Sequence, residues 1–156
     1  MNEGGKQMIK HSIIHAELSG ALASARHKDI IVICDANMPI PDGCHVIDVS
    51  LVRGVPTLLQ TLQAVLNDLV AERYEVFELM PQYNPEMYKT IKELLSKLPG
   101  GTVSQGKLCE CMCRAKAVIR TGDFGSCCTM MLYSASGMDK YVEQFDCSFP
   151  AAKSCL

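Results

Sequence analysis

Two side chains with acid-base character stand at the two ends of one short apolar stretch. His27 lies shortly before the run IIVIC (residues 30–34), and Asp35 follows that run directly. An imidazole gives and takes a proton near neutral pH, and a carboxylate accepts hydrogen bonds from hydroxyl groups. The pair therefore indicates proton transfer on a hydroxyl-rich ligand, or binding of such a ligand.

Each residue also has a plain structural interpretation. An aspartate after a strand often accepts N–H groups of its own turn, and a histidine after a helix often interacts with the helix C-terminus. Pro39 and Pro41 follow Asp35 and restrict the backbone there. Spacing alone does not choose between the functional and the structural interpretation of His27 or of Asp35.

The elements that must position these residues alternate along the chain. Apolar residues at steps of three and four, with cap residues at their ends, predict helices over residues 8–25, 57–70 and 84–98. Short apolar runs predict strands at residues 30–34, 44–52, 74–80, 117–121 and 129–135. This alternation predicts an α/β fold, a single domain with a largely parallel central sheet covered by helices.

Composition narrows the class of protein. The chain has 156 residues, of which 48% are hydrophobic and 21% charged, as expected for one globular domain. Its 15 basic and 17 acidic residues nearly cancel. Without a basic patch we expect no nucleic-acid partner.

The N-terminus and the cysteines bear on the compartment. No apolar run is long enough to span a membrane, and the N-terminus lacks the apolar core of a signal peptide, so we expect a cytosolic protein with no membrane partner. An odd number of cysteines, nine, then favours free thiols over a disulfide framework.

Five of the cysteines lie close together in the sequence, at Cys109, Cys111, Cys113, Cys127 and Cys128. Structural zinc sites use pairs of cysteines spaced by two to four residues and repeated at a distance, which this run lacks. We therefore expect no metal site, and we interpret most of these thiols as small core residues.

Several short motifs occur in order along most of the chain. His27-Lys28-Asp29 is followed by Asp35-Ala36-Asn37-Met38-Pro39-Ile40-Pro41, and then by Val46-Ile47-Asp48, Gly54-Val55-Pro56, Asn84-Pro85 and Ala117-Val118-Ile119-Arg120-Thr121-Gly122-Asp123. This series resembles the ribose pyranase and fucose mutarotase family, and its pyranase branch more closely. The resemblance runs from about residue 8 to residue 135, which divides the chain into a family domain over 1–135 and a C-terminal extension over 136–156 that it does not explain.

The resemblance implies a cytosolic isomerase that interconverts ring forms of a monosaccharide such as ribose or fucose, with no cofactor. It implies a ring-shaped homo-oligomer, commonly a decamer, with sites at the subunit contacts. His27 matches the family's catalytic histidine, and Asp35 matches its sugar-binding aspartate.

Other family positions are altered here. Gln105 stands where the pyranase branch has a substrate-binding histidine, and Arg26 replaces a glycine before His27. Where the family has a tyrosine, a small residue and an asparagine that hold the sugar, this chain has Cys127, Cys128 and Thr129. These replacements leave an alternative open, a non-catalytic or weakly active sugar-binding member of the same fold.

Overall fold

The computed structural model describes residues 13–136, which are organised around one sheet. Its strands are β1 (Ile30–Cys34), β2 (Val46–Asp48), β3 (Ala71–Phe77), β4 (Gly100–Val103), β5 (Ala117–Arg120) and β6 (Met130–Ser134). They lie in the order β2-β5-β1-β6-β3-β4. Only β6 runs antiparallel to its two neighbours, β1 and β3, whereas the other pairings are parallel. The α/β fold with a largely parallel sheet is confirmed.

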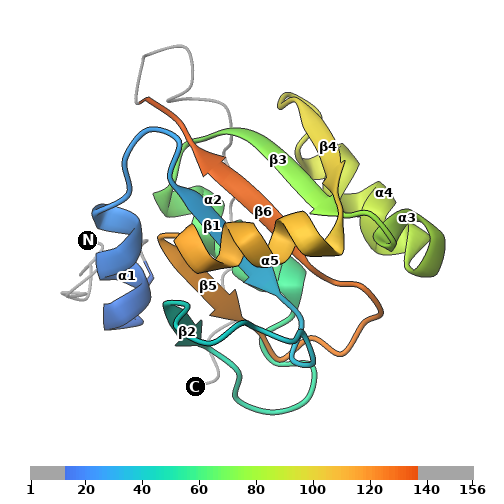
Figure 1. The fold of residues 1–156 in the computed structure, drawn as a ribbon, viewed down its shortest axis with the longest axis horizontal. Coiled ribbons are helices and arrows are strands. Elements are labelled where there is room, and N and C mark those ends of the chain that lie inside the picture. Colours follow the sequence, from blue (N-terminus) through green and yellow to red (C-terminus); the bar gives the residue numbers. More distant parts are fainter. Residues whose placement is uncertain (1–12, 137–156) are drawn as a thin grey trace, which may run out of the picture.

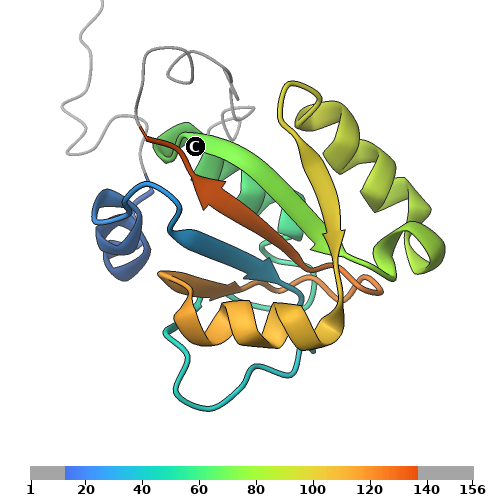
Figure 2. The same cartoon turned by 45° about the horizontal axis from the view of Figure 1, so that its top comes forward.

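Helices cover both faces of the sheet. They are α1 (Ala16–Ala23), α2 (Leu58–Asp68), α3 (Met80–Tyr83), α4 (Pro85–Leu94) and α5 (Gln105–Arg114). Buried residues of α1, α2 and α4 join one core cluster, and those of α5 join the cluster on the opposite face. Figures 1 and 2 show α5 crossing one face of the sheet, with α2 behind the strands. Within residues 13–136, no helix is long and apolar enough to span a membrane.

The strand between His27 and Asp35 lies inside the sheet, as its uninterrupted apolar run predicts. β1 pairs with β5 on one side and β6 on the other, and all five of its side chains are buried. Ile31 and Ile33 pack into the core shared with α2, whereas Val32 and Cys34 pack into the core under α5. The two predicted site residues therefore stand at the two ends of a fully packed strand.

Helix starts follow local capping chemistry. The Asn84 side chain accepts the N–H of Met87, and Pro85 is the first residue of α4, as predicted. In α2 the cap is Thr57, whose side chain pairs reciprocally with Gln60. The preceding proline therefore stands before the cap rather than inside the helix.

Several predicted boundaries differ from the structure. The strand expected at 44–52 is regular only over β2, beyond which Val52 forms an isolated bridge with Val55. β3 begins and ends three residues earlier than expected. The helix expected at 8–25 is seen as α1, with residues 8–12 outside the described part. β4, α3 and α5 were not among the predicted elements. The proposed extension over 136–156 lies almost wholly outside the described residues, so this domain boundary stays a prediction.

A tight backbone contact joins the turn after β5 to the segment before α2. A Cβ added to Gly122 would overlap the carbonyl oxygen of Val55 and lie 2.7 Å from that of Val52. The N–H of Gly122 also donates to the carbonyl of Pro56 at 2.9 Å. Only a residue without a side chain allows this approach.

We expect Gly122→Ala to lower the free energy of unfolding by about 1–3 kcal/mol, because the added methyl group forces two backbone segments apart. Gly20→Ala is the matched control, since a Cβ at this position in α1 meets nothing within 4 Å. That control is expected to stabilise the chain by about 0.5–1 kcal/mol. Chemical denaturation measures both values, and equal stability of the two variants would contradict the close contact.

Candidate active site

His27 and Asp35 lie at opposite edges of the sheet. Asp35 follows the last residue of β1, at the carboxyl edge of the parallel strands, whereas His27 precedes β1 at their amino edge. β1 has five residues and spans roughly 16 Å at about 3.3 Å per residue. One chain therefore does not bring both side chains to the same monosaccharide.

Asp35 is held by two hydrogen bonds and is only 9% exposed. Its Oδ1 atom accepts the N–H of Asn37 at 2.9 Å, and its Oδ2 atom accepts the hydroxyl of Thr129 at 3.2 Å. A carboxylate has about four acceptor positions, so each oxygen keeps capacity for a ligand hydroxyl. The Asn37 contact is the turn role that the sequence left open, and the binding role stays a prediction.

Burial raises the pKa of Asp35 above its ordinary value. The hydrogen bonds from Asn37 and Thr129 act in the opposite direction, and the negative charge of Asp123 raises the pKa further. An ionisable group kept in a desolvated position at a strand end is a recurring feature of binding sites.

The segment before β6 brings Thr129 and Cys127 to this edge. Thr129 is fully buried against Asp35, and Cys127 is half-buried with a left-handed backbone, φ 55°. Burial and, next, the charge of Asp35 raise the pKa of the Cys127 thiol. Non-glycine residues with positive φ are uncommon and concentrate at functional sites.

Unlike the half-buried Cys127, Cys128 places its side chain in the core. Its side chain is fully buried, and its sulfur accepts a hydrogen bond from the Nδ2 atom of Asn84 at 3.2 Å. Burial, with the charges of Asp123 and Asp35, raises the pKa of this thiol to about 12. Cys128 thus remains a neutral thiol within the core beside the site.

Asp123, which motif reading did not single out as a site residue, holds the carboxyl edge together. Its Oδ2 atom accepts the N–H of Leu58 at the start of α2 at 2.9 Å, and its Oδ1 atom accepts the N–H of Gly125 at 2.7 Å. Its backbone carbonyl accepts the N–H of Ala36 at 2.8 Å. The turn-forming Thr121-Gly122-Asp123 segment was the available sequence signal for this role.

Arg120, the last residue of β5, holds the backbone that follows Asp35 in place through hydrogen bonds. Its Nε atom donates to the carbonyl of Ala36 at 3.1 Å, and its Nη1 atom donates to Asp48 at 2.7 Å and to Ser50 at 2.9 Å. The backbone after Asp35 is therefore fixed by both Arg120 and Asp123, which limits movement of the carboxylate.

His27 lies at the amino edge with much of its imidazole exposed. Its Nε2 atom is 3.0 Å from Oε2 of Glu72, the second residue of β3. Because a carboxylate only accepts, the Nε2–H group of the imidazole donates in this contact, and Nδ1 is an acceptor in the tautomer that carries its single proton on Nε2. Glu72 is 45 residues away in the sequence, and no motif identified it beforehand.

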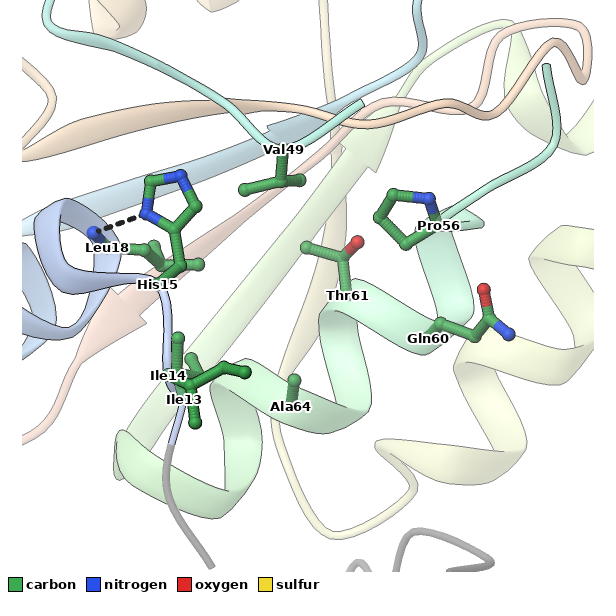
Figure 3. Close-up of a pocket in the computed structure, with 9 residues that line it drawn as sticks. All are labelled: Ile13, Ile14, His15, Leu18, Val49, Pro56, Gln60, Thr61 and Ala64. Atoms are coloured by element: carbon green, nitrogen blue, oxygen red, sulfur yellow. Dashed lines mark hydrogen bonds between the residues drawn. The ribbon is translucent and has the colours of Figure 1, made fainter. Parts of the chain in front are cut away.

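Two cavities differ in their relation to these residues. One cavity of about 340 Å³ lies beside Glu72, which contacts His27. It is lined by Lys28, Ile30, Glu72, Arg73, Arg114 and Tyr133. Another of about 580 Å³ lies between α1 and α2, and its mostly apolar lining includes Ile13, Leu18 and Ala64 (Figure 3). Neither Asp35 nor His27 lines the second cavity. Its apolar surface also suits a hydroxyl-rich ligand poorly.

Gln105 and the cysteine run both lie on α5. Gln105 is the exposed first residue of that helix, so it follows β4 at the same carboxyl edge as Asp35. Cys113 lies near the other end of α5, away from the edge that carries Cys127. Among residues 13–136, no three His, Cys, Asp or Glu side chains converge as a metal site requires.

The chain is similar to several named proteins. A model of the RbsD / FucU transport protein family matches residues 8–136. The D-ribose pyranase of Geobacillus thermodenitrificans is 42% identical over 116 residues, which make up 74% of this chain and 88% of that protein.

Solved structures agree with this match. The structure of Bacillus subtilis RbsD complexed with D-ribose has a TM-score of 0.78 at 33% identity, and the match covers 82% of this chain and 98% of that one. The fucose mutarotase of Streptococcus pneumoniae, solved in complex with L-fucose, has a TM-score of 0.69 at 18% identity, over 81% and 98% of the two chains, and shares the fold. Because the family model matches all of the described residues and a relative is 42% identical, this chain belongs to the RbsD / FucU family.

Proposed function

We propose that this protein is an isomerase that interconverts ring forms of a monosaccharide and needs no cofactor. The observation that carries the proposal is the 42% identity to a D-ribose pyranase, together with a buried carboxylate at the strand end where that family's resemblance places a sugar-binding aspartate. D-Ribose is the first substrate to test, and L-fucose the second. The cytosolic location expected from the sequence stays a prediction.

The chemistry requires two proton movements. Removing the proton of the anomeric hydroxyl and adding one to the ring oxygen breaks the bond between the anomeric carbon and the ring oxygen, which opens the sugar. Reclosure through another hydroxyl gives the other ring size, and reclosure on the other face gives the other anomer. We assign the proton shuttling to His27, whose Nδ1 atom is free to accept while Glu72 holds Nε2.

Asp35 and its neighbours then orient the sugar. The remaining lone pairs of Asp35 accept sugar hydroxyls, and Cys127 is the half-buried neighbour next to them. Gln105 and Thr129 retain hydrogen-bonding groups in place of the family's histidine and asparagine. We assign Cys128 an indirect role, since its side chain faces the core.

A site that uses both His27 and Asp35 takes them from two copies of the chain. Each copy presents Asp35 at one edge and His27 at the opposite edge, so contact between copies is head to tail. Head-to-tail contacts repeated around a rotation axis close into a ring. This supports the ring-shaped homo-oligomer, commonly a decamer, that the family resemblance implies.

A mixture of two impaired variants tests the shared site. In assemblies co-expressed from His27→Ala and Asp35→Asn chains at equal ratio, about a quarter of the sites regain both native groups if each site joins two copies. We expect about a quarter of the wild-type exchange rate, measured at a ribose concentration below half-saturation.

Two controls accompany this measurement. Differently tagged chains recovered together establish that the variants co-assemble, and light scattering compares the size of the mixed and wild-type assemblies. A wild-type monomer at micromolar concentration would contradict the shared site. Co-assembled variants with no more activity than the two pure variants would contradict it as well.

Saturation-transfer exchange with the wild type tests the function itself. We expect faster interconversion of ribose pyranose and furanose forms than in buffer alone. If the wild type binds sugars but accelerates the ring interconversion of none of them, the protein is a sugar-binding protein and not an enzyme. Cys127→Tyr and Gln105→His would then be the first variants in which to look for restored activity.

A further inference from the structure

Two thiols from distant parts of the sequence meet at the amino edge of the sheet. The Cys44 thiol donates a hydrogen bond to the sulfur of Cys113, with 4.0 Å between the two sulfur atoms and 69 residues between them in the chain. Cys44 lies two residues before β2, and Cys113 lies in the last turn of α5. The pair lies away from Asp35 and takes no part in the chemistry assigned to the sugar site.

Both members of the pair are more accessible than the three cysteines of the core, and Cys44 is half-buried as Cys109 and Cys127 are. Cys113 is exposed and Cys44 is half-buried, whereas Cys34, Cys111 and Cys128 are buried. Reagents in solution therefore reach the Cys44 and Cys113 sulfurs but not the core thiols. Access is a main determinant of which thiols are oxidised.

Local backbone structure lets the two sulfurs approach further. A disulfide needs about 2.05 Å between the sulfurs, so they must move roughly 2 Å closer. Cys113 is fixed because Leu108, Cys111 and Met112 anchor α5 in the core. Cys44 stands outside regular structure and next to Gly43, whose φ is +84°. One partner is rigid and the other can adjust.

We propose that Cys44 and Cys113 form a reversible disulfide when the protein meets a hydroperoxide. The thiolate of Cys113 attacks a peroxide oxygen, which breaks the O–O bond, forms a sulfenic acid and releases hydroxide. The sulfur of Cys44 then attacks the sulfenic sulfur, forms the S–S bond and expels a second hydroxide. The two thiol protons convert both hydroxides to water, so two thiols and one hydrogen peroxide yield one disulfide and two waters.

The bond would tie the connection between β1 and β2 to the end of α5. That connection begins at Asp35 and ends beside Cys44, where His45 already contacts the carbonyl of Lys116 at 2.8 Å. Closing a loop of 69 residues restricts the unfolded chain, so the oxidised protein gains stability. An added thiol reductant attacks the disulfide and restores both thiols.

The experiment compares the wild type with Cys44→Ser, Cys113→Ser and Cys109→Ser after treatment of the folded protein with hydrogen peroxide. Cys109 is the matched control because it lies one turn before Cys113 on α5 and is half-buried. Free thiols are titrated after unfolding, and tryptic peptides are identified by mass spectrometry. The bond joins the peptide of residues 29–53 to that of residues 108–114, and fragment ions assign the two cysteines.

For the wild type and Cys109→Ser we expect two free thiols fewer per chain, the cross-linked peptide pair, and a melting temperature higher by about 5 °C or more that a reductant reverses. For Cys44→Ser and Cys113→Ser we expect neither the cross-link nor the melting shift. The proposal is overturned if the wild type shows no such peptide pair, if the bond joins Cys44 to Cys109, or if it joins two chains.

Discussion

Replacing His27 by alanine is expected to lower the ring-exchange rate by about 10² or more while leaving sugar affinity mostly intact. The reason is that proton transfer by a positioned group contributes about 10²–10⁴ to a rate and acts chiefly in the transition state. Saturation-transfer exchange gives the rate, and calorimetric titration gives the affinity for the same sugar.

His45→Ala is the matched control for this variant. His45 is also an exposed imidazole at the amino edge, and its Nε2 atom lies 3.1 Å from Glu17, much as His27 lies 3.0 Å from Glu72. We expect the control to keep the wild-type exchange rate. If His27→Ala accelerates exchange as well as the wild type does, His27 has only a structural role at the start of β1.

Replacing Asp35 by asparagine is expected to weaken sugar binding by about 1–3 kcal/mol, which is roughly 5- to 150-fold in dissociation constant. The amide keeps the shape of the side chain but removes the charge that strengthens hydrogen bonds from sugar hydroxyls. Calorimetric titration measures the change. Asp42→Asn is the control, because Asp42 is an exposed aspartate in the same connection between β1 and β2.

Asp35→Asn also distinguishes an effect on sugar affinity from an effect on the stability of the fold. The pKa of Asp35 is higher in the folded chain than its ordinary 3.8, mainly because of burial, so its contribution to stability falls as pH rises through the range between the two values. An amide has no such dependence, and it still accepts the Asn37 N–H and pairs with the Thr129 hydroxyl. We therefore expect an equal or higher melting temperature at pH 7. A variant that loses affinity and melts much earlier would instead indicate that Asp35 acts mainly as a turn residue.

Local sequence was sufficient for the elements that need no distant partner. The run at 30–34 has no polar residue on either face and is rich in β-branched residues, a pattern that favours a strand packed on both sides, as β1 is. Asn84 and Pro85 define the start of α4 through their own cap and backbone restriction. These signals lie within a few residues of the structure that they predict.

Elements that depend on distant pairing were harder to predict. β4 contains Gly100 and Gly101, which are unfavourable in strands, and it exists because it pairs with β3. Gly100 also leaves room for the ring of Tyr74, because a Cβ there would overlap that ring. α5 was not among the predicted elements, and its buried face is formed partly by Cys111 and Met112, which lie within the run of cysteines that was interpreted as core thiols without assigning a helix.

By itself, the sequence determined the fold class, the family, and the positions of His27 and Asp35 at the two ends of β1. The tertiary structure alone decided which groups surround them: Thr129 beside Asp35, Glu72 beside His27, and the thiol of Cys44 beside Cys113. Those pairs are 94, 45 and 69 residues apart, so only the order and direction of strands bring them together. The separation of His27 from Asp35 has the same origin, because a packed strand holds its two ends at opposite edges of the sheet.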